Sequence, residues 1–86
     1  MIYCESESNY TYIYFEDKKV LLSKTLKEVE RLINHNDFFR VQNSFLVNLN
    51  HIKEYIRGEG GELIMSNGDE VRVSRNKKEE LLKLLT

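Results

Sequence analysis

Hydrophobic and polar residues alternate along much of this chain with a period of two, which is typical of β-strands. The clearest case is residues 10–15, where Thr11, Ile13 and Phe15 fall on one face and three tyrosines on the other. A tyrosine row could stack on nucleotide bases, but on a sheet it is more often half-buried packing, and we interpret it as packing. Further short strands are predicted at residues 2–4, 20–22, 38–41, 45–49, 53–57, 62–65 and 70–73.

Polar and glycine-rich segments separate these strands and predict turns. Residues 5–9 (Glu-Ser-Glu-Ser-Asn) predict a polar turn after the first strand. Asn67-Gly68 is the strongest hairpin signal in the chain, because both residues tolerate the positive φ of a type I′ turn. The run Gly-Glu-Gly-Gly at residues 58–61 predicts a flexible turn. The strands on either side of such turns are expected to pair antiparallel.

Between the early and the central strands the apolar spacing becomes helical. Thr25 followed three residues later by Glu28 is a capping-box pattern, which predicts a mid-chain helix at about residues 25–34. The apolar face of this helix comprises Leu26, Val29, Leu32 and Ile33. Its polar face carries charges of both signs, so we expect it to pack on the sheet rather than to enter a DNA groove.

A second helical segment ends the chain. Asn76 followed by Glu79 predicts a cap that opens a short C-terminal helix at about residues 77–85. Its apolar residues are Leu81, Leu82, Leu84 and Leu85. The predicted fold class is therefore α+β and predominantly β, with several short antiparallel strands, one mid-chain helix and a short C-terminal helix.

Length and composition limit the classes of protein that remain. With 86 residues, no proline and no repeat, residues 1–86 are expected to form a single domain. Cys4 is the one cysteine, so no intramolecular disulfide can form, and we expect it to be a small core residue. No apolar run is long enough to cross a bilayer and no signal peptide precedes the first strand, so we expect a cytoplasmic protein with no membrane partner.

Catalytic and cofactor chemistry finds little support in the sequence. Cys4, His35 and His51 lack metal-ligand spacing, and no local pattern pairs a nucleophile with a base. The glycines at residues 58–61 fit neither of the common phosphate-cradling motifs. We therefore expect neither an enzyme nor a bound cofactor or metal.

Two polar tips are the strongest candidates for function. Residues 42–44 interrupt a strand pair whose inward positions are Phe39, Val41, Phe45, Val47 and Leu49, and residues 74–78 follow another strand. The first tip carries Asn43 and the second Arg75; in DNA recognition, Asn pairs with adenine and Arg with guanine. Each also has an ordinary explanation, since Asn43 can simply form a turn and Arg75 can pair with Glu79 on the protein surface.

The distribution of charge partly supports DNA binding. The net charge of −1 is not that of a basic nucleic-acid-binding domain. The charge is nevertheless divided into blocks: residues 18–57 and 71–86 are positive, residues 1–17 and 58–70 are negative, and both tips lie in the positive blocks. Lys77 and Lys78 are suitably placed to neutralise phosphates, although solvated lysines are the simpler interpretation.

Taken together, several motifs resemble the LytTR-type (LytR/AlgR family) DNA-binding domains, which are output modules of many response regulators of bacterial two-component systems. The matching segments are Ser8-Asn9-Tyr10, Thr25-Leu26, Phe39-Arg40, Asn43-Ser44-Phe45-Leu46-Val47-Asn48, Asn67-Gly68 and Val73-Ser74-Arg75. They extend over essentially the whole chain. Gln42 stands where family members often carry histidine.

The resemblance implies a mostly β fold in which loops enter successive major grooves of double-stranded DNA, often at promoter repeats, for transcription regulation. By position it implies that Asn43 and Arg75 read bases and that the Ser8-Asn9 turn is a third loop. The residues implied as backbone contacts or supports are Arg40, Ser44, Asn76, Lys77 and Lys78, and Asn48 is expected to be structural. A receiver domain outside this chain and a dimer on paired sites stay open. The alternative is a protein-interaction module that uses sheet edges or the tyrosine face.

Overall fold

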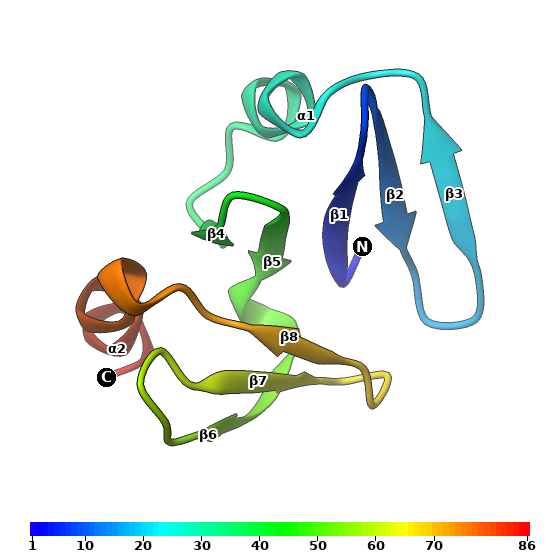
Figure 1. The fold of residues 1–86 in the computed structure, drawn as a ribbon. Helices are drawn as coiled ribbons and strands as arrows, with labels where there is room; N and C mark the ends of the chain where they lie inside the picture. Colours follow the sequence, from blue (N-terminus) through cyan, green and yellow to red (C-terminus); the bar gives the residue numbers. More distant parts are fainter.

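Eight short strands form two antiparallel sheets in the computed structural model, which describes residues 1–86 (Figure 1). The five-stranded sheet has the order β3-β2-β1-β5-β4 and comprises β1 (Tyr3–Glu7), β2 (Tyr10–Tyr14), β3 (Lys19–Leu22), β4 (Phe38–Gln42) and β5 (Phe45–Asn48). The three-stranded sheet has the order β6-β7-β8 and comprises β6 (Ile52–Ile56), β7 (Glu62–Met65) and β8 (Glu70–Arg72). The helices are α1 (Leu26–Ile33) and α2 (Lys78–Leu85), with single 3₁₀ turns η1 (Leu49–His51) and η2 (Arg75–Lys77). The predicted α+β, predominantly β fold class is confirmed.

The first hairpin is longer than predicted. Residues 5–9 were expected to form a turn, but Glu5, Ser6 and Glu7 continue β1 and pair with residues 12, 11 and 10 of β2. The turn is confined to Ser8 and Asn9, and Ser8 adopts a φ of 58°. Cross-strand pairing with the β-prone residues of β2 therefore outweighs the polar composition of this segment.

Helix α1 begins as its capping box predicts. The backbone N–H of Glu28 donates to Thr25 Oγ1 at 3.2 Å, and the Thr25 N–H donates to Glu28 Oε1 at 3.3 Å. The hydrogen bonds that the Thr25 N–H and the Thr25 hydroxyl donate to the Glu28 carboxylate lower the pKa of this group. The helix ends at Asn34, whose left-handed φ of 38° closes the last turn. Leu32 was expected on the buried face but is 68% exposed, because it lies at the edge of that face, whereas Ile33 in the same turn packs against the core.

The predicted cap of the C-terminal helix is wrong. The η2 turn precedes α2, and the N-cap residue, Lys77, makes no side-chain capping hydrogen bond. Asn76 Oδ1 instead accepts a hydrogen bond from the Ser74 hydroxyl. Leu81 is the one fully buried leucine of α2, whereas Leu84 and Leu85 are exposed. Leu81 therefore anchors this helix to the core.

The hairpin at Asn67-Gly68 forms, but not with the predicted type I′ turn. Gly68 has a φ of 92°, whereas Asn67 does not have a positive φ. The Gly68 N–H donates to the Met65 carbonyl at 2.8 Å, and Asn67 Oδ1 accepts from the Asp69 N–H at 3.0 Å. The loop thus has three residues with a left-handed glycine at its end, the next most common hairpin geometry.

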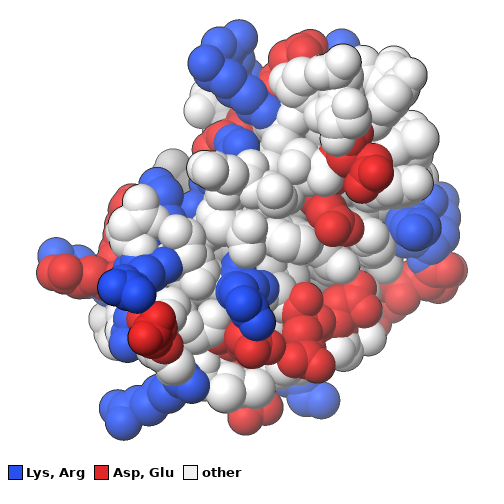
Figure 2. Space-filling model, viewed as in Figure 1, with Lys and Arg blue, Asp and Glu red and all other residues white.

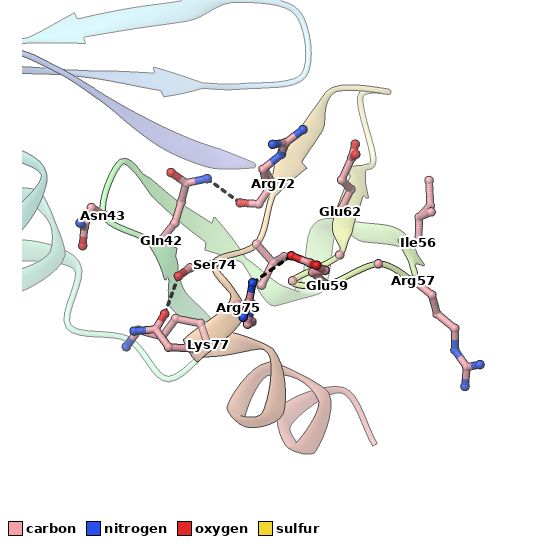
Figure 3. A pocket seen from close by; sticks show the side chains of 15 residues that line it. Gln42, Asn43, Ile56, Arg57, Glu59, Glu62, Arg72, Ser74, Arg75 and Lys77 are labelled. Atoms are coloured by element: carbon pink, nitrogen blue, oxygen red, sulfur yellow. Dashed lines mark hydrogen bonds and ion pairs between the residues drawn. The ribbon is translucent and has the colours of Figure 1, made fainter.

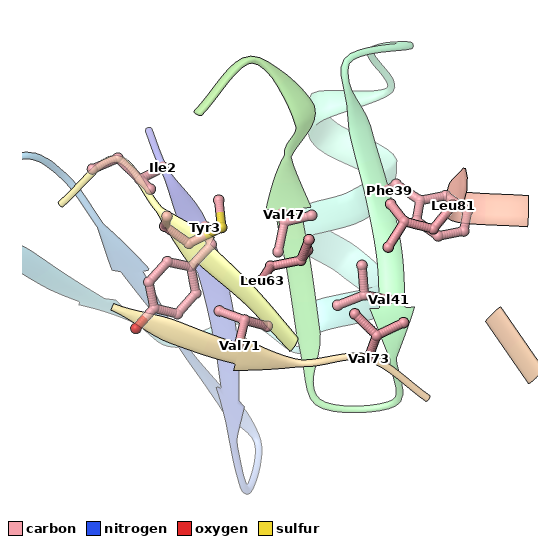
Figure 4. Packing of buried hydrophobic residues seen from close by; sticks show 10 residues of the cluster. Ile2, Tyr3, Phe39, Val41, Val47, Leu63, Val71, Val73 and Leu81 are labelled. Carbon is pink, nitrogen blue, oxygen red and sulfur yellow. The ribbon is translucent and has the colours of Figure 1, made fainter. Parts of the chain in front are cut away.

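Two hydrophobic clusters arrange the elements in layers. The larger cluster lies between the two sheets and includes Val41, Val47, Leu63, Val71 and Leu81 (Figure 4). The smaller cluster joins the five-stranded sheet to α1 and comprises Cys4, Ile13, Leu26, Val29 and Leu46. Because Leu46 and Val47 are both fully buried, β5 is covered on both faces. The predicted burial of Cys4, Phe39, Val41 and Val47 is confirmed, and Phe45 and Leu49 are half-buried.

The tyrosine row is largely packing, as interpreted from the sequence. Tyr14 stacks on Tyr3 with ring centroids 4.3 Å apart, and both Tyr12 and Tyr14 are half-buried. Tyr10 is the exception, since it lies at the start of β2 and is 46% exposed. The Tyr3 hydroxyl donates to Asp69 Oδ2 at 3.0 Å, which fastens the five-stranded sheet to the β7–β8 turn.

Raising the pH above about 10 is expected to destabilise the fold through Tyr3 and Tyr14. Burial and the hydrogen bond to Asp69 raise the pKa of Tyr3 well above its ordinary value, and burial with the hydrogen bond to Glu5 raises the pKa of Tyr14 to about 12. Because the unfolded chain releases both protons at lower pH, stability is complete below about pH 10 and falls as the pH rises toward 12. Denaturant unfolding across this range measures the decline, which should be shallower in Tyr14→Phe; an equally steep decline would contradict the assignment.

No helix of this fold has the length and apolar composition needed to span a membrane.

Candidate nucleic-acid interface

The two predicted tips lie side by side. The Ser74 N–H donates to the Val41 carbonyl at 2.9 Å, and Gln42 Nε2 donates to the Arg72 carbonyl at 2.7 Å. These two hydrogen bonds join the end of β4 to the segment that follows β8, although the two are about thirty residues apart in sequence. The packing of Val41 and Val73 in the shared core holds the same junction from beneath (Figure 4).

The tips border an open, mostly polar hollow of about 660 Å³ (Figure 3). The β6–β7 loop lines it on the side away from the β4–β5 tip (Figure 3). The charged residues that line it are the cations Arg57, Arg72, Arg75 and Lys77 and the carboxylates Glu59 and Glu62. Asn43 and Gln42 contribute amides to the same rim. An amide and a guanidinium are thus presented around one concave surface, which is the combination that reads adenine and guanine.

Asn43 is exposed at the β4–β5 turn, and its backbone is held from below by Arg40. Arg40 Nη2 donates to the Asn43 carbonyl at 2.7 Å, and Arg40 Nε donates to the Gln42 carbonyl at 3.2 Å. The third contact of Arg40 is an ion pair with Glu30 of α1 at 2.8 Å. Arg40 therefore uses its donors inside the protein, which makes it a support of the tip rather than an available phosphate ligand.

Arg75 extends into solvent, with its side chain 77% exposed. Its Nη2 atom lies 3.0 Å from Glu59 Oε2, across the hollow's edge (Figure 3). The pairing with Glu79 that the sequence suggested does not form. Glu79 Oε1 instead lies 4.0 Å from Lys83 Nζ on the exposed side of α2. The partner of Arg75 is thus distant in sequence and belongs to the β6–β7 loop.

The remaining basic residues differ in how free their side chains are. Lys77 lines the hollow with its Nζ atom 5.7 Å from the centroid of the Phe39 ring. Lys78 lies outside the hollow and donates from Nζ to the Gly58 carbonyl at 3.2 Å. Asn76 lines the hollow and is bonded to Ser74. Lys77 is the lysine best placed to reach a phosphate beside the hollow.

Asn9 and Ser44 do not line the hollow. Asn9 is exposed in the β1–β2 turn. The neighbouring Ser6 N–H donates to the Ser44 carbonyl at 2.8 Å, so this part of β1 runs next to the β4–β5 tip. Asn48 is structural, as expected, because Nδ2 donates to the Met1 carbonyl at 3.0 Å and Oδ1 accepts from the Asn50 N–H at 3.0 Å.

The sequence interpretation missed the β6–β7 loop. Residues 58–61 were predicted to be a flexible turn, yet the Tyr55 hydroxyl donates to the Gly60 carbonyl at 3.1 Å and the Val73 N–H donates to the Gly61 carbonyl at 3.0 Å. The loop is therefore fixed against the base of the Arg75 segment. Its glycines were the available signal, because clustered glycines also mark places where backbones approach closely.

The charges do not form one continuous basic surface on the face shown in Figure 2, where basic and acidic groups alternate around α2 and the three-stranded sheet. The hollow itself holds four cationic side chains and two carboxylates. Binding of a polyanion there depends on local placement of cations and not on the net charge of −1.

Comparisons with known proteins agree with the fold described above. Residues 1–86 match the family model described as the LytTr DNA-binding domain. The chain is 36% identical over 87 residues to the sensory transduction protein LytT of Bacillus subtilis, and 28% identical over 88 residues to the CO-responsive transcriptional regulator RcoM of Rhodospirillum rubrum. Each match covers 99% of this chain but only 36% and 37% of the relative, so the chain spans little more than a third of their length. A solved LytTr DNA-binding domain from Bacillus cereus superposes with a TM-score of 0.85 at 34% identity, covering 98% of this chain and 79% of that one.

Proposed function

Since the chain belongs to the LytTr family of DNA-binding domains, we propose that it recognises specific sequences in double-stranded DNA by inserting loops into the major groove. The observation that carries this proposal is the meeting of Asn43 and Arg75 at one hollow, from two segments that hydrogen bonds hold together. Loops with an amide and a guanidinium suit direct readout of base edges. Both side chains are exposed, so neither needs to leave a buried position to bind.

Within this proposal the residues have different roles. Arg75 pairs with guanine, Asn43 pairs with adenine, and Asn9 belongs to a third loop. Arg40 and Ser44 support the tip, while Asn76, Lys77 and Lys78 contact or support contacts with the phosphate backbone. Phosphate contacts fix the register of the domain, and the base contacts supply its sequence preference.

The names of the relatives extend the proposal to the whole protein. One relative is a sensory transduction protein and another a transcriptional regulator. We infer that this domain is the output part of a bacterial transcriptional regulator acting in the cytoplasm at promoter repeats, linked to a receiver domain and dimeric on paired sites.

A mobility-shift assay at two salt concentrations tests the function directly. We expect tight binding to a duplex selected from a random library, weaker binding to random duplex, and a marked loss of affinity for both at higher salt, because neutralised phosphates release counterions. Absence of binding, or binding that is indifferent to salt and sequence, would contradict the proposal.

Lys77→Ala is expected to weaken binding to all duplexes by a similar factor and to make the slope of log affinity against log salt shallower by about one unit. The reason is the loss of a single phosphate contact that carries no sequence information. Lys83→Ala is the matched control, since Lys83 is an exposed lysine of α2 that does not line the hollow. An unchanged slope in Lys77→Ala would exclude this residue from the interface.

A further inference from the structure

We propose that Glu59 is a specificity-determining residue: its carboxylate positions the guanidinium of Arg75 toward a base edge and keeps it from settling on the phosphate backbone. The inference rests on the proposed function and adds to it a residue of the β6–β7 loop, whose acidic charge would ordinarily argue against a place in a DNA interface.

The loop presents Glu59 from a fixed backbone. Beyond the hydrogen bonds of Tyr55 and Val73 to this loop, Lys78 Nζ donates to the Gly58 carbonyl at 3.2 Å. Gly60 packs so closely on the neighbouring segment that a Cβ atom there would overlap the Val73 carbonyl oxygen. The same Cβ atom would lie 3.0 Å from the backbone nitrogen of Arg75. The backbone of the loop is thus in direct contact with the backbone that carries Arg75, and the ion pair links two segments whose relative position is set.

The ion pair leaves most of the guanidinium available. Only Arg75 Nη2 contacts Glu59, at 3.0 Å. A guanidinium has five N–H donors, so the remaining ones can serve the O6 and N7 acceptors of guanine. A free arginine loses about 2 kcal/mol of rotamer entropy when it is immobilised. A carboxylate that already restricts the side chain reduces that cost in the complex.

Stability does not explain the pair. The Arg75 and Glu59 side chains are 77% and 83% exposed, and ion pairs with such exposure contribute little to folding. Its effect on DNA recognition is larger, because the pair of Arg75 and Glu59 has no net charge and is attracted less to phosphates than Arg75 alone. Glu59 itself is repelled by phosphates, so a pose with Arg75 on the backbone is penalised, whereas a pose with Arg75 on a base edge keeps the pair intact.

Glu59→Gln in the full chain tests this role, because the amide keeps the size of the side chain and removes its charge. The probes are the selected duplex, the same duplex with its Arg75-dependent guanine replaced, and a random duplex. We expect the ratio of affinities for the first two duplexes to fall about three- to tenfold. This corresponds to part of the discrimination that a bidentate contact to guanine supplies. We expect affinity for the random duplex to rise, because one repulsive charge has been removed.

Glu62→Gln is the matched control. Glu62 lines the same hollow, but no ion pair joins it to Arg75. Its loss should raise affinity for every duplex and leave discrimination unchanged. If Glu59→Gln behaves like Glu62→Gln, or weakens all duplexes equally, the positioning role is overturned. If the wild-type domain binds none of the duplexes, the proposed function fails instead, so the two failures are distinguishable.

Discussion

Arg75→Ala is expected to remove about 1–3 kcal/mol of binding free energy from the selected duplex and to relax the base preference at one position. Arg75 lines the hollow with an exposed side chain. Its backbone is fixed by the contact with Gly60 of the β6–β7 loop and by the hydrogen bond of the neighbouring Ser74 N–H to Val41 of β4. A bidentate contact to guanine loses both hydrogen bonds in the variant, whereas the other contacts of the interface stay. Affinity for random duplex should fall much less.

The measurement is a set of titrations with the selected duplex and with duplexes changed at each position in turn. Arg31→Ala removes the same charge from the exposed side of α1, away from the hollow, and controls for electrostatics alone. Base readout by Arg75 is supported if Arg75→Ala loses the base preference at one position while Arg31→Ala keeps it at every position. Equal weakening of all duplexes by Arg75→Ala would make Arg75 a phosphate contact and overturn its assigned role.

Among the sequence patterns, those formed by residues close together in the chain predicted the structure most reliably. The capping box at Thr25 and Glu28 forms with both of its hydrogen bonds, and the hairpin at Asn67-Gly68 is present. Both depend on residues within a few positions of one another, so local chemistry determines them. The Asn76 cap failed because an alternative local hydrogen bond, from the Ser74 hydroxyl, satisfies that side chain.

The sequence identified the two tips that line the hollow but not the residues that support them. Asn43 and Arg75 were selected because their side-chain chemistry suits base recognition, a role that stays a prediction. Arg75 pairs with Glu59, 16 residues away, and Arg40, which holds the Asn43 carbonyl, pairs in turn with Glu30, 10 residues away. Such pairs depend on which strands are neighbours, and alternation of apolar residues does not determine strand order.

Strand order also determines which charged residues of this chain, whose net charge is −1, meet at the hollow. The block of residues 58–70 is negative, yet only Glu59 and Glu62 of its carboxylates reach the hollow, where four cations from three separate segments meet them. Asp69 instead receives the Tyr3 hydroxyl and belongs to the junction of the sheets. The fold therefore separates Asp69, which joins the sheets, from the carboxylates that line the hollow.

Gly60→Ala is expected to be among the most damaging substitutions in the chain, costing about 3 kcal/mol of folding free energy. A methyl group there would overlap the Val73 carbonyl oxygen, and neither backbone can give way without breaking the hydrogen bond between Val73 and Gly61. A domain of 86 residues has a total stability of about 4–13 kcal/mol, so this loss is a large fraction of the total.

Gly58→Ala is the matched control in the same loop. A Cβ atom at Gly58 meets only ordinary contacts at 3.7 Å, so the change should be close to neutral or slightly stabilising. Denaturant unfolding measures the stability of both variants, and titration with the selected and random duplexes, under conditions where each variant is folded, measures recognition. Because Gly60 contacts the backbone of Arg75, Gly60→Ala should also lose discrimination at the Arg75-dependent guanine, whereas Gly58→Ala should keep it. Equal stability of the two variants would show that the loop yields to the methyl group. The inference that a fixed loop backbone holds Glu59 beside Arg75 would then be wrong.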